Sequence, residues 1–387
     1  MKKIVYGTNG IREFYTDDGK LKCYCSDSKA KEDVCECDLD DFDVAVSENG
    51  VLYAMTQSKG NLYVSAYNGV WSSECVLEST KIENYNRSIT LISNNNWLCA
   101  FYILKHDEKF LLVHQIFGSR TNPDVICESV NEINFCIVKD TNRNIHIAYT
   151  NGETLQTAVY VWKAKRWENR TTVMTLEENV SHISMCLDEK NNKHIALCIK
   201  SLNTYKVIVD SMIVASSLSR SVQCCLINNK NSVFCVFEYY GKLLSSEFKD
   251  DKWENVKYFH CDGFEKYELV KISGQKDFDF NESNYIYTYV SKNQNKYKRL
   301  FGTENDYINY QKKLNNMEDD NNVEKFAGVT RSETKSVSEE IKSIKRAIES
   351  DDTPQILLQI VSRLNDMENI LSKVVEIVTE INQKTVG

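Results

Sequence analysis

Two pairs of cysteines near the N-terminus carry the chemistry from which metal sites are built. Cys23 and Cys25 are separated by one residue, and so are Cys35 and Cys37. Residues i and i+2 of a β-strand share a face, so two such pairs can present four thiolates to one ion such as zinc. Structural zinc sites use Cys-x-x-Cys spacing more often, and two alternatives stay open: disulfide cross-linking in an oxidising setting, or four free thiols near a sheet edge. The spacing favours free thiols, and no cofactor is expected.

The other cysteines are expected to pack as apolar side chains. The chain has 14 cysteines, and most lie inside apolar runs. The N-terminal segment MKKIVYGTNGIREFY has no apolar stretch and no small-residue cleavage site, so it is not expected to be a secretory signal. Free thiols in a reducing compartment are then the default. Cys99, Cys136, Cys198 and Cys235 are expected to act as small core hydrophobes.

Three tryptophans recur at similar places along the chain: Trp71, Trp167 and Trp253. An exposed indole ring stacks well on the C–H face of a pyranose, which makes these three residues the candidate ligand-binding residues. A buried ring would instead be a wedge between neighbouring repeat units. The apolar residues Val70 and Val256, close to two of the rings, favour the wedge.

Two histidines, His146 and His194, occupy the same place in consecutive repeats. A histidine on an inner strand can face a central channel and bind a ligand or metal, or it can bond a neighbouring turn. The other repeats carry Leu52, Leu98, Phe234 and Ile286 at this place. Because those residues are apolar, the position favours packing, and a structural role is expected for both histidines.

The elements that position these residues follow from a repeat in the first three hundred residues. A turn rich in Asn, Asp, Lys or Gly precedes an apolar strand six times, in SENGVLYAM, SNNNWLCAF, DTNRNIHIAY, DEKNNKHIAL, NNKNSVFCVF and FNESNYIYTYV. Aligned at positions 52, 98, 146, 194, 234 and 286, the repeats are 46, 48, 48, 40 and 52 residues apart. Each of these strands follows another apolar strand, and several precede a third and a fourth. Four short strands per unit of about 40 to 50 residues are typical of a β-propeller blade.

Six repeats predict a mainly β, six-bladed propeller over residues 1–303. The segments KKIVYGTNG and REFYTDDGKLKCYC are strand-like but lack a full unit, so they either complete the last blade or begin a seventh, which is the alternative count. The stretch from Asp140 to Ala148 resembles the Asp-x-x-Gly-Asn-x-His-hydrophobic-Ala strand turn of sialidase-like and lectin-like propellers. This motif-level resemblance implies a propeller and includes carbohydrate among the expected ligands. The Ser-x-Asp-x-Gly-x-Thr-Trp box of sialidases and the Trp-Asp ending of WD40 repeats are absent.

An enzyme on this fold would be a glycoside hydrolase with a carboxylate pair near the channel. A sialidase also needs clustered arginines that grip the substrate carboxylate. The arginines of the repeat region do not recur at one position; they are Arg12, Arg87, Arg120, Arg143, Arg166, Arg170, Arg220 and Arg299. The chain is therefore expected not to be an enzyme, with a glycoside hydrolase kept as an alternative.

The C-terminal part has a different composition. Residues 304–335 are polar and are predicted to be a linker, and a capping-box pattern at Ser336-Val-Ser-Glu339 begins a helical tail over 336–387. A heptad repeat follows, which predicts a coiled coil. Its two seams contain Leu357, Leu364, Leu371 and Val378, and Ile360, Met367, Val374 and Ile381. Apolar residues also flank these seams, so a homo-oligomer of three or more chains is expected, with a tetramer favoured.

Charge excludes several kinds of partner. The chain has 47 basic and 55 acidic side chains and a formal net charge of -8. Nucleic-acid binders need a basic excess, and an anionic surface suits an anionic membrane poorly. No run of 18 apolar residues is present, so no membrane span is expected. The expected location is cytoplasmic, with leaderless assembly into a surface or coat layer as the alternative.

Propellers held on one coiled coil would form a multivalent cluster. The expected function is therefore a non-catalytic, lectin-like binding or structural protein that displays its propellers to glycan or protein ligands. The alternative is a self-assembling, cysteine-rich scaffold or coat protein.

Overall fold

The structure, a computed structural model, describes residues 2–258 except 8–9, 26–27, 39–40, 80–84, 95–96, 119–121, 203, 230–231 and 241, together with three later strands. The chain divides into two units, Met1–Tyr307 and Ile308–Gly387. The predicted linker over 304–335 and the predicted coiled-coil tail over 336–387 lie outside the described residues.

Every regular element in the described residues is a β-strand, which confirms the mainly β fold. Four sheets are antiparallel meanders of four consecutive strands. They consist of β5 (Phe42–Val46), β6 (Leu52–Ser58), β7 (Asn61–Tyr67) and β8 (Trp71–Leu77); β9 (Thr90–Asn94), β10 (Trp97–His106), β11 (Lys109–Phe117) and β12 (Asp124–Ser129); β13 (Phe135–Lys139), β14 (Ile145–Thr150), β15 (Thr154–Val161) and β16 (Arg166–Thr175); and β17 (Asn179–Leu187), β18 (Lys193–Ser201), β19 (Thr204–Val209) and β20 (Met212–Leu218).

A fifth sheet has five strands. It is the meander of β21 (Cys224–Asn229), β22 (Ser232–Tyr239), β23 (Lys242–Lys249) and β24 (Lys252–Trp253), and β25 (Lys257–Tyr258) also pairs with β23.

The sixth sheet joins the two ends of the first unit. Four antiparallel strands form one half: β1 (Lys2–Gly7), β2 (Gly10–Asp17), β3 (Lys20–Cys25) and β4 (Lys31–Glu36). The other half consists of β26 (Leu269–Gly274), β27 (Ile286–Val290) and β28 (Tyr297–Arg299). The halves meet where β1 pairs with β26 in parallel, with Ile4 opposite Ile272. The N-terminal strand therefore closes the arrangement against a strand almost 270 residues later.

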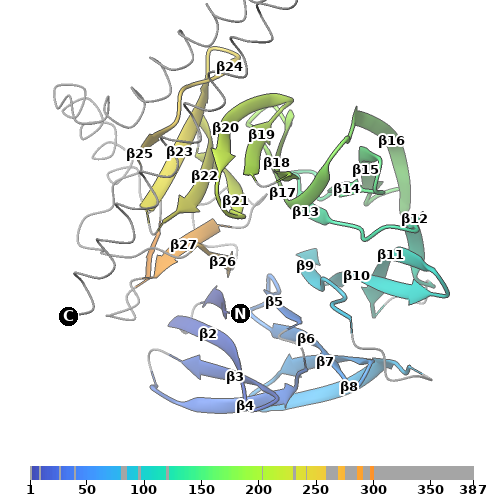
Figure 1. Ribbon diagram of the computed structural model, residues 1–387. Helices are drawn as coiled ribbons and strands as arrows, with labels where there is room; N and C mark the ends of the chain where they lie inside the picture. Colours follow the sequence, from blue (N-terminus) through green and yellow to red (C-terminus); the bar gives the residue numbers. More distant parts are fainter. Residues whose placement is uncertain are drawn as a thin grey trace, which may run out of the picture. The chain divides into compact units, whose positions relative to one another are not determined.

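The first strands of successive sheets lie around a common centre, and the fourth strands lie at the outside (Figure 1). Strand β1 contacts β5, β5 contacts β9, β13 contacts β17, and β17 contacts β21. Between β9 and β13, the Lys139 ammonium donates a hydrogen bond to the Ser93 carbonyl over 3.1 Å. This succession of antiparallel meanders is consistent with a β-propeller.

The hydrophobic core lies between neighbouring sheets. One cluster packs Phe14 and Leu21 of the first meander against Phe42 and Val44 of the next. Similar clusters fill the spaces between the later pairs of sheets. Burying one such side chain contributes about 1.5–3 kcal/mol. The four sheets from β5–β8 to β17–β20 therefore each depend on both neighbours for stability.

The six predicted repeat strands are the second strands of their meanders, namely β6, β10, β14, β18, β22 and β27. The first 36 residues, expected to lack a full unit, instead form four consecutive strands. The sequence pattern missed this unit because β2 carries Arg12 and Glu13 where the repeat has apolar residues.

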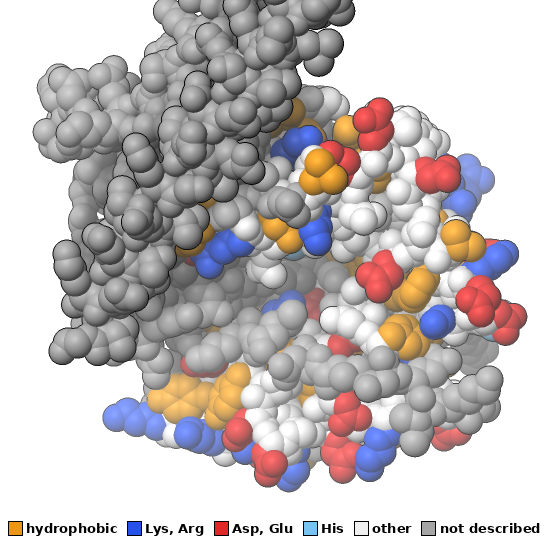
Figure 2. All heavy atoms as spheres, in the orientation of Figure 1, with side chains coloured by type: hydrophobic (Ala, Val, Ile, Leu, Met, Phe, Trp, Pro, Cys, Tyr) orange, Lys and Arg blue, Asp and Glu red, His pale blue; other side chains and the backbone are white. Residues whose placement is uncertain are grey.

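Charge on the molecular surface is mixed. Figure 2 shows acidic and basic side chains interspersed over one face of the described residues, without a large field of either sign. Within the described ranges, no helix has the length and apolar content that crossing a membrane requires.

Candidate functional site

A cleft of about 370 Å³ lies between the β13–β16 sheet and the β17–β20 sheet. Its walls are largely aliphatic, and its polar groups are an ammonium, a carboxylate and three hydroxyls. The lining residues are Leu155, Thr157, Thr171, Val173, Met174, Lys193, Ile195, Leu197, Ile208, Asp210 and Ser211. Ligand sites typically combine such an apolar wall with a few converging polar groups and begin at about 300 Å³. The cleft is therefore large enough for one small ligand.

Lys193, at the start of β18, is the cationic group of the cleft. Its ammonium donates a hydrogen bond to the Thr157 hydroxyl over 3.4 Å, and that hydroxyl lies 2.9 Å from the Thr171 hydroxyl. Lys193 is half-buried, and desolvation lowers its pKa. No carboxylate of the described residues forms an ion pair with it. A half-buried cation without a counter-ion favours a ligand that brings an anionic group.

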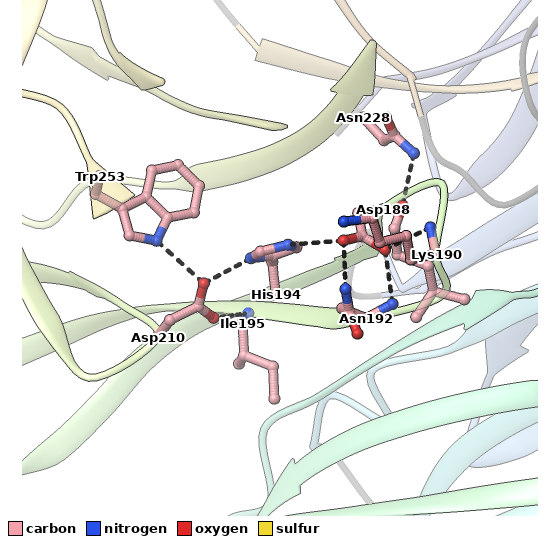
Figure 3. Close-up of polar contacts among 9 residues, drawn as sticks. Asp188, Lys190, Asn192, His194, Ile195, Asp210, Asn228 and Trp253 are labelled. Atoms are coloured by element: carbon pink, nitrogen blue, oxygen red, sulfur yellow. Dashed lines mark hydrogen bonds and ion pairs between the residues drawn. The ribbon is translucent and has the colours of Figure 1, made fainter. Parts of the chain in front are cut away.

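Asp210, in the turn after β19, forms the acidic side of the cleft and is held by three donors (Figure 3). The His194 ring donates to it from Nδ1 over 2.6 Å, and the Trp253 indole donates over 3.0 Å. The backbone N–H of Ile195 donates to the second carboxylate oxygen over 2.9 Å. Because three donors orient this carboxylate, Asp210 is a fixed acceptor at the edge of the cleft.

The turn before His194 is also fixed by a carboxylate. Asp188 accepts hydrogen bonds from the backbone N–H and the side-chain amide of Asn192, both over 2.7 Å (Figure 3). Asp140 and Asn144 repeat this arrangement one unit earlier, where Asp140 also bonds His146 over 3.0 Å. Both histidines thus contact carboxylates of the turns, as expected for a structural role.

The three candidate tryptophans pack against the preceding sheet rather than lining the cleft. The Trp71 indole donates to Glu32 of β4 over 3.0 Å. Trp167 makes edge-on contacts with Phe101 and His114, on β10 and β11. Trp253 is buried against β18 and the turn after β19. Rings held between sheets in this way occupy the position expected of wedges.

The four N-terminal cysteines do not converge on one point. Cys23 and Cys25 share the buried face of β3, as their spacing predicted. The Cys23 sulfur lies 3.9 Å from the Arg12 guanidinium, whereas Cys35 contacts the Thr56 hydroxyl at 3.4 Å. Cys37 instead contacts backbone carbonyls. Burial raises the pKa of Cys23 to about 11, so this thiol is protonated at neutral pH.

Another cysteine group does converge. Among the described residues, the one cluster of three metal-binding side chains is His182, Cys198 and Cys224. Sequence analysis assigned Cys198 to the core and did not single out His182 or Cys224. Cys198 and Cys235 are fully buried, as expected, and so is Cys99, while Cys136 is half-buried. The eight oligomerisation residues of the heptad lie outside the described residues.

Sequence analysis also missed the cleft. One available signal lies one residue before the position at which the six repeats were aligned. The residues there are, in chain order, Val51, Trp97, Ile145, Lys193, Val233 and Tyr285. Lys193 is the single charged residue in this series, and a charge where other units have an apolar side chain indicates a special environment.

Comparisons with known proteins do not show a family for this chain. No protein-family model matches the chain. No curated protein matches it. Among solved structures, the chain is similar to an ulvan lyase, a polysaccharide lyase, at 10% identity, covering 76% of this chain and 90% of the other, with a TM-score of 0.49. It is also similar to Drosophila semaphorin 1a (10% identity, 70% and 81% covered, TM-score 0.45) and to the Dos1 propeller (7% identity, 69% and 72% covered, TM-score 0.44).

These matches correct the expectation that the chain is not an enzyme, because polysaccharide lyases are enzymes. The scarcity of recurring arginines speaks against one way of gripping a substrate, not against catalysis on this fold. At 10% identity or less, the likeness concerns the fold and assigns no reaction or substrate to this chain.

Proposed function

We propose that this chain is a ligand-binding β-propeller that takes a small anionic ligand in the cleft between the β13–β16 and β17–β20 sheets. The observation that carries the proposal is Lys193, a half-buried ammonium in that cleft without a carboxylate partner in the described residues. A bound carboxylate would supply the missing charge in surroundings that are partly shielded from water.

The remaining groups of the cleft narrow the class of ligand. The Thr157 and Thr171 hydroxyls lie beside the ammonium, and Asp210 and Ser211 form another part of the wall. Hydroxyl groups of a ligand can bond these residues, while its C–H surface packs on the aliphatic walls. A small sugar acid combines these features. A neutral sugar of the same size would leave the ammonium unpaired.

Seven blades are the proposed count. The β1–β4 meander has the four strands of a complete blade, and β26–β28 supply three strands of another. Five further sheets lie between these two groups in the sequence. The parallel pairing of β1 with β26 joins the first and last blades through their inner strands.

The predicted coiled coil at the C-terminus would make the protein multivalent. An oligomer of three or more propellers would present as many clefts on one particle. Linked sites can raise avidity by about 10²- to 10⁴-fold without new contacts at each site. Even if each cleft binds its ligand weakly, the oligomer would then attach strongly to a polymer that carries many copies of this ligand.

Titration calorimetry with glucuronate and glucose tests the cleft. The wild-type chain should bind glucuronate and should bind glucose at least about tenfold more weakly, since a charge-assisted hydrogen bond contributes about 1.5–3 kcal/mol. Lys193→Met should weaken glucuronate binding by a similar factor. Lys200→Met is the matched control, because Lys200 is exposed on the same strand and does not line the cleft.

Two outcomes would contradict this function. Equal affinity for glucuronate and glucose would show that the ammonium does not select the ligand. Equal loss of binding in the Lys193 and Lys200 variants would place the ligand elsewhere.

A further inference from the structure

Three side chains with metal-binding chemistry meet between the β17–β20 and β21–β24 sheets. His182 on β17 stands directly opposite Cys198 on β18 in the strand register. In the next sheet, Cys224 lies on β21. The first sheet therefore supplies two potential ligands to the space between the sheets, and the second supplies one.

The distances suit one tetrahedral ion. The ligand atoms of His182, Cys198 and Cys224 all lie within 4.8 Å of one another, and the His182 Nδ1 is 3.9 Å from the Cys224 sulfur. A zinc ion with bonds of about 2.3 Å to sulfur and about 2.0 Å to nitrogen holds its tetrahedral ligands about 3.5–3.8 Å apart. The observed separation between nitrogen and sulfur exceeds this by a few tenths of an ångström, which side-chain rotation can supply.

The two thiols of this group are fully buried. Cys198 and Cys224 belong to one hydrophobic cluster, which also contains Cys235. Two thiols and one imidazole leave the fourth position of a tetrahedral ion to water, as in zinc sites with three protein ligands.

The position of the imidazole favours a ligand role. Buried thiols behave as small apolar groups and need no partner. The His182 Nδ1 is aimed at the Cys224 sulfur over 3.9 Å, which is a long and weak hydrogen bond. Because His182 is only half-buried, an ion can reach the group from that side.

We propose that His182, Cys198 and Cys224 bind one Zn²⁺ ion that cross-links the β17–β20 and β21–β24 sheets, with water in the fourth position. The imidazole coordinates through Nδ1, and each cysteine coordinates as a thiolate. Two S–H bonds break, two Zn–S bonds form, and two protons pass to solvent, with no change of oxidation state. The soft sulfur ligands select zinc over magnesium or calcium, which prefer oxygen.

Metal analysis of the full-length chain, purified under reducing conditions with zinc present and then desalted, tests the proposal. About one zinc per chain is expected. Replacement by Co²⁺ should produce the intense visible and charge-transfer absorption of tetrahedral thiolate-bound cobalt. A strong chelator should remove the ion and lower the melting temperature, because a metal bound only by the folded state stabilises it.

Cys224→Ser should lose the bound zinc and the cobalt spectrum. Cys225→Ser is the matched control, since Cys225 is equally buried and adjacent in the chain but points to the opposite face of β21. This variant should keep about one zinc per chain.

Three results would overturn the proposal. The first is a wild-type chain that holds less than about a tenth of an equivalent of zinc and gives no cobalt spectrum. The second is equal metal loss from the Cys224 and Cys225 variants. The third is a Cys198–Cys224 disulfide in unreduced peptide maps of freshly prepared protein, which would identify the cluster as a redox cross-link.

Discussion

His114 on β11 shows how packing between two sheets fixes the charge of a side chain. The ring is 1% exposed and stacks on Phe101 at 4.7 Å, with Tyr160 and Trp167 edge-on. Neither ring nitrogen has a hydrogen-bond partner in the described residues, and the Asp124 carboxylate, 3.9 Å away, is too distant to bond. Burial lowers the pKa of His114 to about 4, so the ring is neutral at physiological pH.

This histidine should make the fold sensitive to mild acid. In the unfolded chain the ring titrates near 6.5, so below that pH the unfolded state binds more protons than the folded state. The stability present above pH 6.5 is then lost as the pH falls toward 4. His114→Phe keeps the aromatic packing and removes the titration. From pH 7 to pH 5, the free energy of unfolding of the wild type should therefore fall by about 2 kcal/mol more than that of this variant.

Urea denaturation at the two pH values measures this difference. His106→Phe makes the same substitution at an exposed ring on β10 and should keep the full wild-type loss. A His114→Phe variant that loses as much stability in acid as the wild type would mean that another group carries the sensitivity.

At the scale of the elements, the strands could be predicted because their signals are local. Alternation of apolar residues and Asn-rich turns marked six second strands, and the capping carboxylates Asp140 and Asp188 lie in the turns that precede two of them. The unit at the N-terminus escaped notice because Arg12 and Glu13 interrupt this local pattern in β2.

The two sites could not be predicted because their residues meet across neighbouring sheets. Thr157 and Lys193 of the cleft are 36 residues apart, and His182 and Cys224 are 42 apart. Each pair spans about one repeat, and nothing within either strand shows which side chains face each other once the sheets pack. The apolar run around Cys198 identified it as a core residue, but His182 comes from the neighbouring strand β17 and Cys224 from the facing sheet.

Trp253 is the strongest test of packing between sheets. It is 6% exposed, contacts Phe248 and His194, and donates its indole N–H to Asp210. Trp253→Ala should lower the free energy of unfolding by about 3–5 kcal/mol, because a cavity forms and Asp210 loses a donor.

Thermal or urea unfolding measures the effect, with Trp97→Ala as the control. Trp97 is 38% exposed on β10, so its truncation should cost markedly less. Similar losses in the two variants would show that Trp253 does not hold the sheets together.

At the scale of the first unit, stability depends on closing the ring of sheets. The β1–β26 pairing joins the two ends. Near it, the Lys3 ammonium lies 3.3 Å from Asp43 of β5, and Asp43 in turn accepts a hydrogen bond from the Leu91 N–H of β9 over 2.8 Å. One buried carboxylate therefore links three successive first strands, so loss of either end strand should affect sheets beyond its immediate neighbour.

At the scale of the whole molecule, assembly is expected to depend on the C-terminal heptad. Leu364→Asp together with Leu371→Asp places two charges in one seam of the predicted coiled coil. Bringing several chains together would then bury like charges without partners, so the oligomer should dissociate into monomers. Light scattering should report a fall from three or more chains to one, while the affinity of each cleft stays unchanged. The helical circular dichroism signal of the tail should fall at the same time, because isolated helices are marginally stable in water. Binding to a surface densely coated with the ligand should fall about 10²- to 10⁴-fold, because avidity is lost.

Ser362→Asp with Asn369→Asp is the control. It adds the same charges on the opposite helical face and should leave the oligomer intact. If the seam variant remains oligomeric, the propeller unit itself must carry the association, and the tail would have another role.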